Sequence, residues 1–235
     1  MLIRAKFEEL HPVKYISHLE LMDTFRRAYR RAGLPLAYSQ GFNPHMILSL
    51  GQPLKVGMIG EAEYFDLELA EDMELSEFIN QVNENLPEGL KILDARVIPE
   101  DLKSLMAVIN TADYVLNMDF TDNTLESTEK QRGMLEEFLS QRSINVIRHR
   151  RNKKDRELDI RQLLYGADLL ETGRWLFRVK CGSNGNLRPE ELVRALADYF
   201  TEINEIPVIN VEREGLYVNI GDKFYSPLDD KVIGS

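Results

Sequence analysis

Cysteine is almost absent from this sequence, because Cys181 is the only one among 235 residues. A single cysteine excludes an internal disulfide. It also excludes a self-contained iron–sulfur cluster and a thiolate zinc site, since both need several cysteine ligands. The four histidines, at positions 11, 18, 45 and 149, include no closely spaced pair. We therefore expect neither a metal site nor a cofactor in this chain.

Long apolar runs are missing too. The sequence has no stretch of about 18 apolar residues, so no membrane-spanning helix is expected. The first ten residues, MLIRAKFEEL, carry an acidic side chain by position 8 and do not resemble a signal peptide, which favours a cytoplasmic location. The sequence also lacks G-x4-G-K-[ST] and G-x-S-x-G, the patterns of a phosphate-binding loop and of a nucleophilic serine.

Acidic residues outnumber basic ones by 39 to 29, which gives a formal net charge of −10. Taken alone, this balance argues against a general nucleic-acid binder. The charges are segregated, however. Residues 1–50 carry seven basic and four acidic side chains, residues 61–101 carry two and thirteen, and residues 148–156 (RHRRNKKDR) carry six and one. Two basic islands in an acidic protein are typical of a surface that attracts a polyanion. The alternative is a solvated surface whose arginines pair with carboxylates.

A capped helix is predicted from Ser17 to about Ala32. Ser17-His18-Leu19-Glu20 is a capping-box pattern, and Gly33 with Pro35 beyond it is a usual helix stop. At 100° per residue, the apolar side chains share one face, which should be buried. The basic side chains lie on or beside the opposite face: Arg26, Arg27, Arg30 and Arg31.

The loop after this helix combines turn residues with aromatic and polar side chains. Gly41 and Asn43-Pro44 are typical of a turn. Aromatic side chains beside the arginines could stack on unpaired bases, or they could pack a hinge. The candidate binding residues of this loop are Tyr38, Ser39, Gln40, Gly41, Phe42 and Asn43. His18 and His45, at the two ends of the helix–loop segment, are the candidates for general acid/base catalysis if they lie near each other.

Hydrophobic periodicity predicts an α+β fold of two tandem ferredoxin-like units. In residues 1–105, strands are expected at 1–9, 46–50, 64–69 and 90–98 and helices at 17–32 and 76–86, which is the βαββαβ order. Residues 106–235 repeat a similar order, with helices at 129–141 and 189–200 and strands at 114–120, 144–147, 158–164, 175–180, 208–212 and 216–220. The halves share no visible sequence identity, so the repeat is inferred from element order alone.

The stretch from Tyr15 to His45 resembles a bacterial family of radical-SAM-linked proteins of unknown function. The similar residues are Ser17-His18-Leu19, Leu21-Met22, Arg26, Arg30 to Pro35 and Tyr38 to His45, and later in the chain a basic patch followed by Asp159-Ile160-Arg161. Glu20 and Met46 depart from the Asp and Pro usual in the family. The resemblance implies an association with RNA or ribosome maturation and a radical-SAM enzyme as partner. The chain has no Cys-x3-Cys-x2-Cys, so it cannot hold the radical-SAM cluster itself.

These patterns favour a non-catalytic RNA-binding or adaptor module that works with a radical-SAM enzyme on tRNA or rRNA. Asp159 and Arg161 would shape its second basic patch. Two alternatives stay open: an RNA-processing or RNA-modifying enzyme that uses His18 and His45, and a protein-binding subunit whose acidic first domain docks a basic partner. The candidate phosphate-binding residues are Arg26, Arg27, Arg30, Arg31, Arg148, Arg150, Arg151, Lys153, Lys154 and Arg156.

Overall fold

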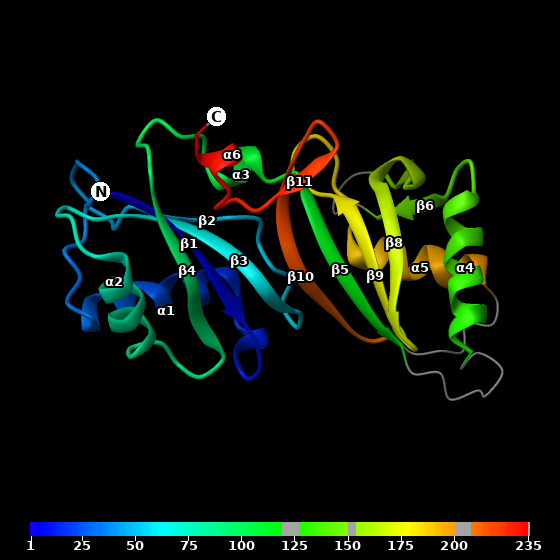
Figure 1. Cartoon of the computed structure of the whole chain (residues 1–235), viewed down its shortest axis with the longest axis horizontal. Coiled ribbons are helices and arrows are strands. Elements are labelled where there is room, and N and C mark those ends of the chain that lie inside the picture. Colours follow the sequence, from blue (N-terminus) through cyan, green and yellow to red (C-terminus); the bar gives the residue numbers. More distant parts are fainter. Residues whose placement is uncertain (119–126, 150–153, 201–207, 235) are drawn as a thin grey trace. The chain divides into compact units, whose positions relative to one another are not determined.

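The computed structural model describes residues 1–118, 127–149, 154–200 and 208–234, and it confirms a mixed α+β fold (Figure 1). The chain divides into two compact units. The first consists of Met1–Asn110 with Gly215–Ser235, and the second of Thr111–Glu214. This division differs from the predicted domains 1–105 and 106–235, because the C-terminal segment returns to the first unit after the second is complete.

The first unit has the element order predicted for residues 1–105. Its elements are β1 (Leu2–Glu9), α1 (His18–Arg31), β2 (Leu48–Leu50), β3 (Ile59–Glu68), α2 (Leu75–Asn83) and β4 (Leu90–Ile98). Strand β1 lies between β3 and β4 and is antiparallel to both, and β2 pairs antiparallel with β3. Shorter elements complete this unit: η1 (Val13–Tyr15), α3 (Leu105–Val108), β11 (Lys223–Tyr225) and α6 (Asp230–Ile233).

Helices α1 and α2 pack on one face of this sheet and form its core (Figure 1). The ring centroid of Phe25 lies 5.0 Å from that of Phe7, 5.3 Å from that of Phe65 and 5.6 Å from that of Tyr29. Phe25 and Tyr29 are four residues apart on α1, so they share its buried side. Alternate residues of β1 and β3 supply the facing rings. The predicted amphipathic character of α1 is therefore confirmed.

A buried ion pair occupies the other face of the sheet. The side chain of Arg4 on β1 is completely buried and donates to both carboxylate oxygens of Asp66 on β3, at 2.8 and 3.0 Å. It also donates to the main-chain carbonyl of Lys103 at 3.2 Å. A buried guanidinium is tolerated only with such partners, so Arg4 ties the segment before α3 to the sheet.

The second unit contains a sheet and a separate hairpin. Its elements are β5 (Thr111–Met118), α4 (Thr128–Ser140), β6 (Asn145–Arg148), β7 (Arg156–Asp159), η2 (Arg161–Leu163), β8 (Leu164–Glu171), β9 (Arg174–Lys180), α5 (Pro189–Tyr199) and β10 (Val208–Ile220), whose end belongs to the first unit. Strand β9 pairs antiparallel with β5 and β8, and β10 lies beside β5. Strands β6 and β7 form a separate two-stranded antiparallel sheet.

Three predicted strands in the second half have different bounds in the structure. The expected strand 158–164 is divided among β7, η2 and β8, and the expected strands 208–212 and 216–220 form the single strand β10. Gly215 lies inside β10, where a glycine weakens a strand without ending it. Because β6 and β7 interrupt the second unit, the tandem ferredoxin-like repeat stays a prediction.

The capping box predicted at the start of α1 is confirmed. The Ser17 hydroxyl accepts from the Glu20 amide at 3.3 Å, and the Glu20 carboxylate accepts from the Ser17 amide at 2.7 Å. The hydrogen bond from the Ser17 amide lowers the pKa of Glu20 below its ordinary value. Helix α1 therefore begins at a fixed residue.

Replacing Ser17→Ala should lower the free energy of unfolding by about 1 kcal/mol, since this is the usual cost of losing a helix N-cap. The measurement is urea unfolding followed by circular dichroism. The control is Ser76→Ala, an exposed position in α2, where the change should stay below about 0.5 kcal/mol. Equal losses in the two variants would contradict the capping role.

Candidate functional site

The basic face predicted for α1 lies at the surface, but most of its arginines have partners in the first unit. Arg26 donates to the Asp23 carboxylate at 3.0 Å, and Arg27 donates to the Thr24 hydroxyl at 3.3 Å. Arg31 donates to the main-chain carbonyl of Asn85. Arg30 is exposed, and the residues that the structure describes give it no hydrogen-bond or ion-pair partner. Exposed pairs of this kind contribute little and exchange readily, so phosphate binding by α1 stays a prediction.

The predicted motif loop is a closed, well-defined segment, which we call the 39–45 loop. The Ser39 amide donates to the His45 carbonyl at 2.9 Å, and the His45 amide donates to the Ser39 hydroxyl at 3.1 Å. The same hydroxyl lies 2.8 Å from His45 Nδ1. Tyr38 and Met46 form an antiparallel bridge directly outside the loop, while Phe42 within it is completely exposed.

His18 and His45 occupy different surroundings in the first unit. His18 lines a small pocket with the buried side chains of Glu9, Glu63 and Tyr64, and His45 is not among the lining residues. The cavity volume is about 10 Å³, which is the lower limit for a single water molecule. Burial raises the pKa of Tyr64 to about 12, so its phenol is neutral at pH 7. This geometry does not favour an acid/base pair, and catalysis by the two histidines stays a prediction.

The β6–β7 hairpin is anchored to α5 by Arg148. Its Nε and Nη2 donate to the two carboxylate oxygens of Glu191 at 2.5 and 2.6 Å, and Nη2 also donates to the carbonyl of Asn186 at 2.6 Å. Glu191 is buried. Its hydrogen bond raises the pKa of Arg148 above the ordinary value. Arg148 therefore holds the hairpin in place and is not free to hold a phosphate in this structure.

Asp159 and Arg161 fix the base of the same hairpin. One carboxylate oxygen of Asp159 accepts from the amides of Ile144 and Arg161, each at 2.9 Å. The Arg161 guanidinium donates to the carbonyls of Leu139 at 2.9 Å and Leu164 at 3.3 Å. Both side chains are thus used to position main chain around the basic segment.

The connection between β6 and β7, together with Arg156 at the start of β7, carries the remaining cations of the basic run. Lys154 and Arg156 are exposed, and His149 Nδ1 lies 2.9 Å from the Asp155 carboxylate. Three of the predicted phosphate-binding residues lie outside the described residues: Arg150, Arg151 and Lys153. Sequence reasoning missed a further cation beside this hairpin. Exposed Arg194 of α5 donates to the Ile147 carbonyl of β6 at 3.2 Å. No local pattern could have linked two residues 47 positions apart.

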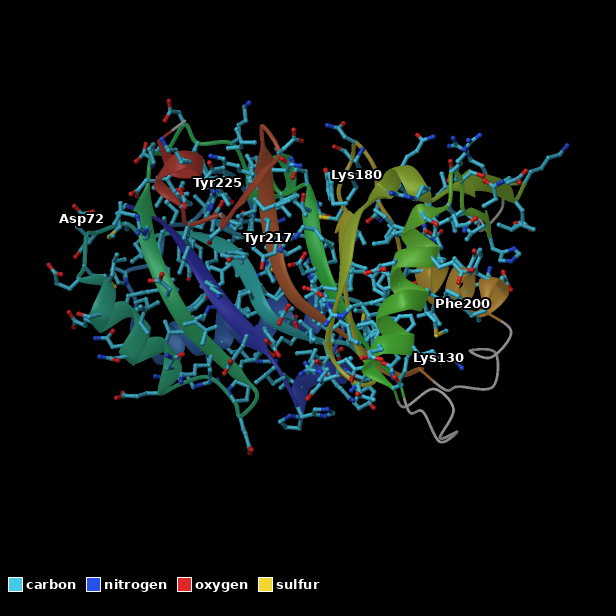
Figure 2. The ribbon with its side chains drawn as sticks, turned by 45° about the vertical axis from the view of Figure 1, so that its right-hand side comes forward. Asp72, Lys130, Lys180, Phe200, Tyr217 and Tyr225 are labelled. Carbon is cyan, nitrogen blue, oxygen red and sulfur yellow. The ribbon has the colours of Figure 1, made fainter. Side chains whose placement is uncertain are left out.

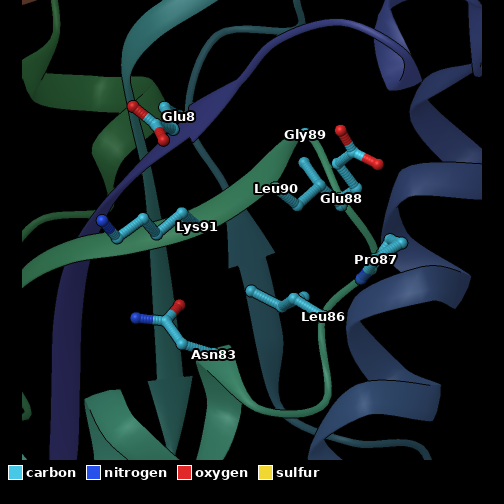
Figure 3. Close-up of a pocket in the computed structure, with 8 residues that line it drawn as sticks. All are labelled: Glu8, Asn83, Leu86, Pro87, Glu88, Gly89, Leu90 and Lys91. Atoms are coloured by element: carbon cyan, nitrogen blue, oxygen red, sulfur yellow. The ribbon is translucent and has the colours of Figure 1, made fainter.

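A larger pocket of about 340 Å³ opens in the first unit between the end of α2 and β4. Figure 3 shows Leu86 and Leu90 on one side of it and Asn83 and Lys91 on the other. The size suits a small ligand, but Asn83, one of its polar side chains, is already used by the neighbouring main chain. Asn83 accepts from the Ile92 amide at 2.7 Å and donates to the Ile92 carbonyl at 3.0 Å. The pocket therefore points to no particular chemistry.

Metal ligands and membrane spans were both expected to be absent. Within residues 1–118, 127–149, 154–200 and 208–234, no group of three or more His, Cys, Asp and Glu side chains is arranged to hold a metal ion. None of the helices in these ranges is long and apolar enough to cross a membrane. The expectation that the chain holds no cofactor stays a prediction.

Comparison with known proteins identifies the family of this chain. The model of a family described as "Uncharacterized protein conserved in bacteria (DUF2344)" matches residues 2–189, and the chain belongs to this family. A bacterial family of unknown function was expected from the Tyr15–His45 stretch, while the link to a radical-SAM enzyme stays a prediction. No curated protein matches the sequence.

One solved structure with some likeness is a chain from a crystal structure of a Cbf5-Nop10-Gar1 complex. The sequences are 11% identical, the TM-score is 0.44, and the match covers 90% of this protein. The protein spans only 47% of the length of that chain. A likeness this distant carries no argument about function.

The structure assigns an anchoring role to Arg148, which gives a stability test. Replacing Arg148→Ala leaves the buried Glu191 carboxylate without its partner, and the free energy of unfolding should fall by about 3 kcal/mol. Arg156 faces Arg148 across the hairpin and is exposed, so Arg156→Ala should change it by less than about 0.5 kcal/mol. Urea unfolding measures both. If the two variants were equally stable, Arg148 would not be the anchor.

Proposed function

We propose that this protein is an RNA-binding or adaptor module that works with a radical-SAM enzyme in RNA or ribosome maturation, with tRNA or rRNA as its nucleic-acid partner. Its main phosphate-binding element would be the β6–β7 hairpin. One observation carries this proposal: the most basic segment of an acidic chain follows β6, whose last residue Arg148 is tied to α5 by Glu191, and Lys154 and Arg156 in this segment are exposed. Exposed cations on an anchored hairpin suit a polyanion.

The electrostatics of the hairpin support RNA over a neutral partner. Six basic residues and one acidic residue occupy positions 148–156. Arg148 is neutralised by Glu191, and Arg194 of α5 adds a cation at the β6 main chain. Cations this close together in sequence repel one another in the free protein. Phosphates relieve that repulsion and release their own counterions on binding, which makes association favourable and dependent on salt.

The other parts of the proposal depend on the resemblance and on strand order. The resemblance of Tyr15–His45 to radical-SAM-linked proteins supplies the enzyme partner. The interpretation as two ferredoxin-like units is supported by the strand orders β4-β1-β3-β2 and β10-β5-β9-β8, with the hairpin as an insertion in the second. An insertion on an otherwise regular unit is a usual place for a binding function.

Charge reversal on the hairpin should weaken RNA binding. The double variant K154E/R156E should bind fluorescein-labelled total tRNA or rRNA at least about tenfold more weakly than the wild type at 100 mM salt, because two phosphate-binding cations are replaced by anions. R150E/R151E, in the same connection, should behave alike. Fluorescence anisotropy measures the affinity.

The matched control is R132E/K223E, which changes the charge by the same amount at exposed positions of α4 and β11. Its affinity should stay within about twofold of the wild type, since both positions lie outside the hairpin. Circular dichroism and thermal unfolding establish that all variants fold. Equal losses in the hairpin and control variants would show that only net charge matters, and the hairpin assignment would then fail.

A further inference from the structure

The connection between β6 and β7 is closed by a contact between a histidine and an aspartate. Arg148 and Arg156 are the last facing pair of the two strands, and the side chains of His149 and Asp155 meet directly beyond them. His149 Nδ1 lies 2.9 Å from a carboxylate oxygen of Asp155, and both side chains are more than half exposed. The contact therefore lies at the surface, beside the cations that the proposed function assigns to RNA.

This contact determines which nitrogen of the neutral His149 ring carries the proton. An ionised carboxylate only accepts hydrogen bonds, so we assign the proton to Nδ1, which donates to Asp155. The other nitrogen, Nε2, is then an acceptor. The residues that the structure describes give Nε2 no hydrogen-bond partner. Because a phosphate oxygen is also an acceptor, neutral His149 cannot bind a phosphate through Nε2.

Protonation of His149 reverses this property. The imidazolium carries a hydrogen on both nitrogens, so Nε2 becomes a charged donor while Nδ1 still donates to Asp155. Histidine is the side chain that ordinarily changes its charge between about pH 5 and pH 8. Asp155 is also the only acidic residue in 148–156, and its pairing with the imidazolium offsets the one charge of this run that repels phosphate.

The other charged groups near His149 come from the hairpin and from α5. Helix α5, whose C-cap is Phe200, lies beside the hairpin (Figure 2), and its Glu191 is paired with Arg148. The remaining charged side chains at this end of the hairpin and of α5 are Lys154, Asp155, Arg156, Glu157, Glu190 and Arg194. Within the described residues, the one that contacts His149 is Asp155. A bound phosphate would stabilise the imidazolium by direct contact, so phosphate binding and protonation favour each other.

We propose that His149 is a further phosphate-binding residue of the hairpin, and that its Nε2 binds an RNA phosphate only when the ring is protonated. RNA binding at the hairpin then takes up a proton at His149, while Asp155 holds the ring through Nδ1. This inference rests on the proposed RNA-binding function and adds a dependence of that function on pH. The affinity that His149 contributes is present at low pH and is lost as the pH rises and the ring loses its proton.

Fluorescence anisotropy with labelled tRNA or rRNA, at pH 6 and pH 8 and constant ionic strength, tests this proposal. The wild type should bind at least about threefold more tightly at pH 6, because an imidazolium adds one charged phosphate contact. His149→Gln should bind within about twofold of the wild type at pH 8 and lack the gain at pH 6. His149→Arg is charged at both pH values, so it should bind tightly at both. The control His11→Gln, at an exposed histidine of the first unit, should keep the wild-type gain.

Three results would overturn the proposal. His149→Gln could keep the gain at pH 6, it could weaken binding equally at both pH values, as a purely structural role requires, or His149→Arg could leave the pH dependence unchanged. Wild-type binding that depends on Lys154 and Arg156 but not on pH would overturn this inference and leave the proposed function standing. If the folded wild type bound neither RNA at either pH, both would fail.

Discussion

The packing of Phe25 between Phe7 and Phe65 is the interaction on which the first unit depends. It buries one side of α1 against β1 and β3 and therefore turns the arginine side toward water. Burial of a single such ring stabilises a fold by about 1.5–3 kcal/mol, which exceeds the contribution of any exposed ion pair on the same helix. With α1 fixed, the chain after Gly33 meets the end of β3, and the 39–45 loop is held there by main-chain pairing.

In the second unit, as in the first, the residues that hold an element in place differ from those that it exposes to solvent. The Asp159 contacts with Ile144 and Arg161 hold the base of the β6–β7 hairpin, and the Arg148–Glu191 pair ties its other end to α5. Beyond this pair, Lys154 and Arg156 are exposed.

Local patterns predicted the parts of the structure that local forces determine. The capping box at Ser17, the buried face of α1 and the element order of the first unit followed from hydrogen bonding and periodicity within a few residues. Long-range contacts were not predictable in this way. Arg148 was taken for a phosphate ligand because its partner Glu191 lies 43 residues away. The return of residues 215–235 to the first unit likewise depends on tertiary structure.

The salt dependence of RNA binding by the wild-type protein tests the central claim most directly. Five cations of the hairpin run remain when Arg148 is set aside: Arg150, Arg151, Lys153, Lys154 and Arg156. If these cations hold phosphates, the logarithm of the association constant for tRNA or rRNA should fall with the logarithm of salt concentration with a slope of about −3.5, since each phosphate contact with a single strand contributes about −0.7. A slope near zero, or no binding to either RNA at low salt, would contradict the account.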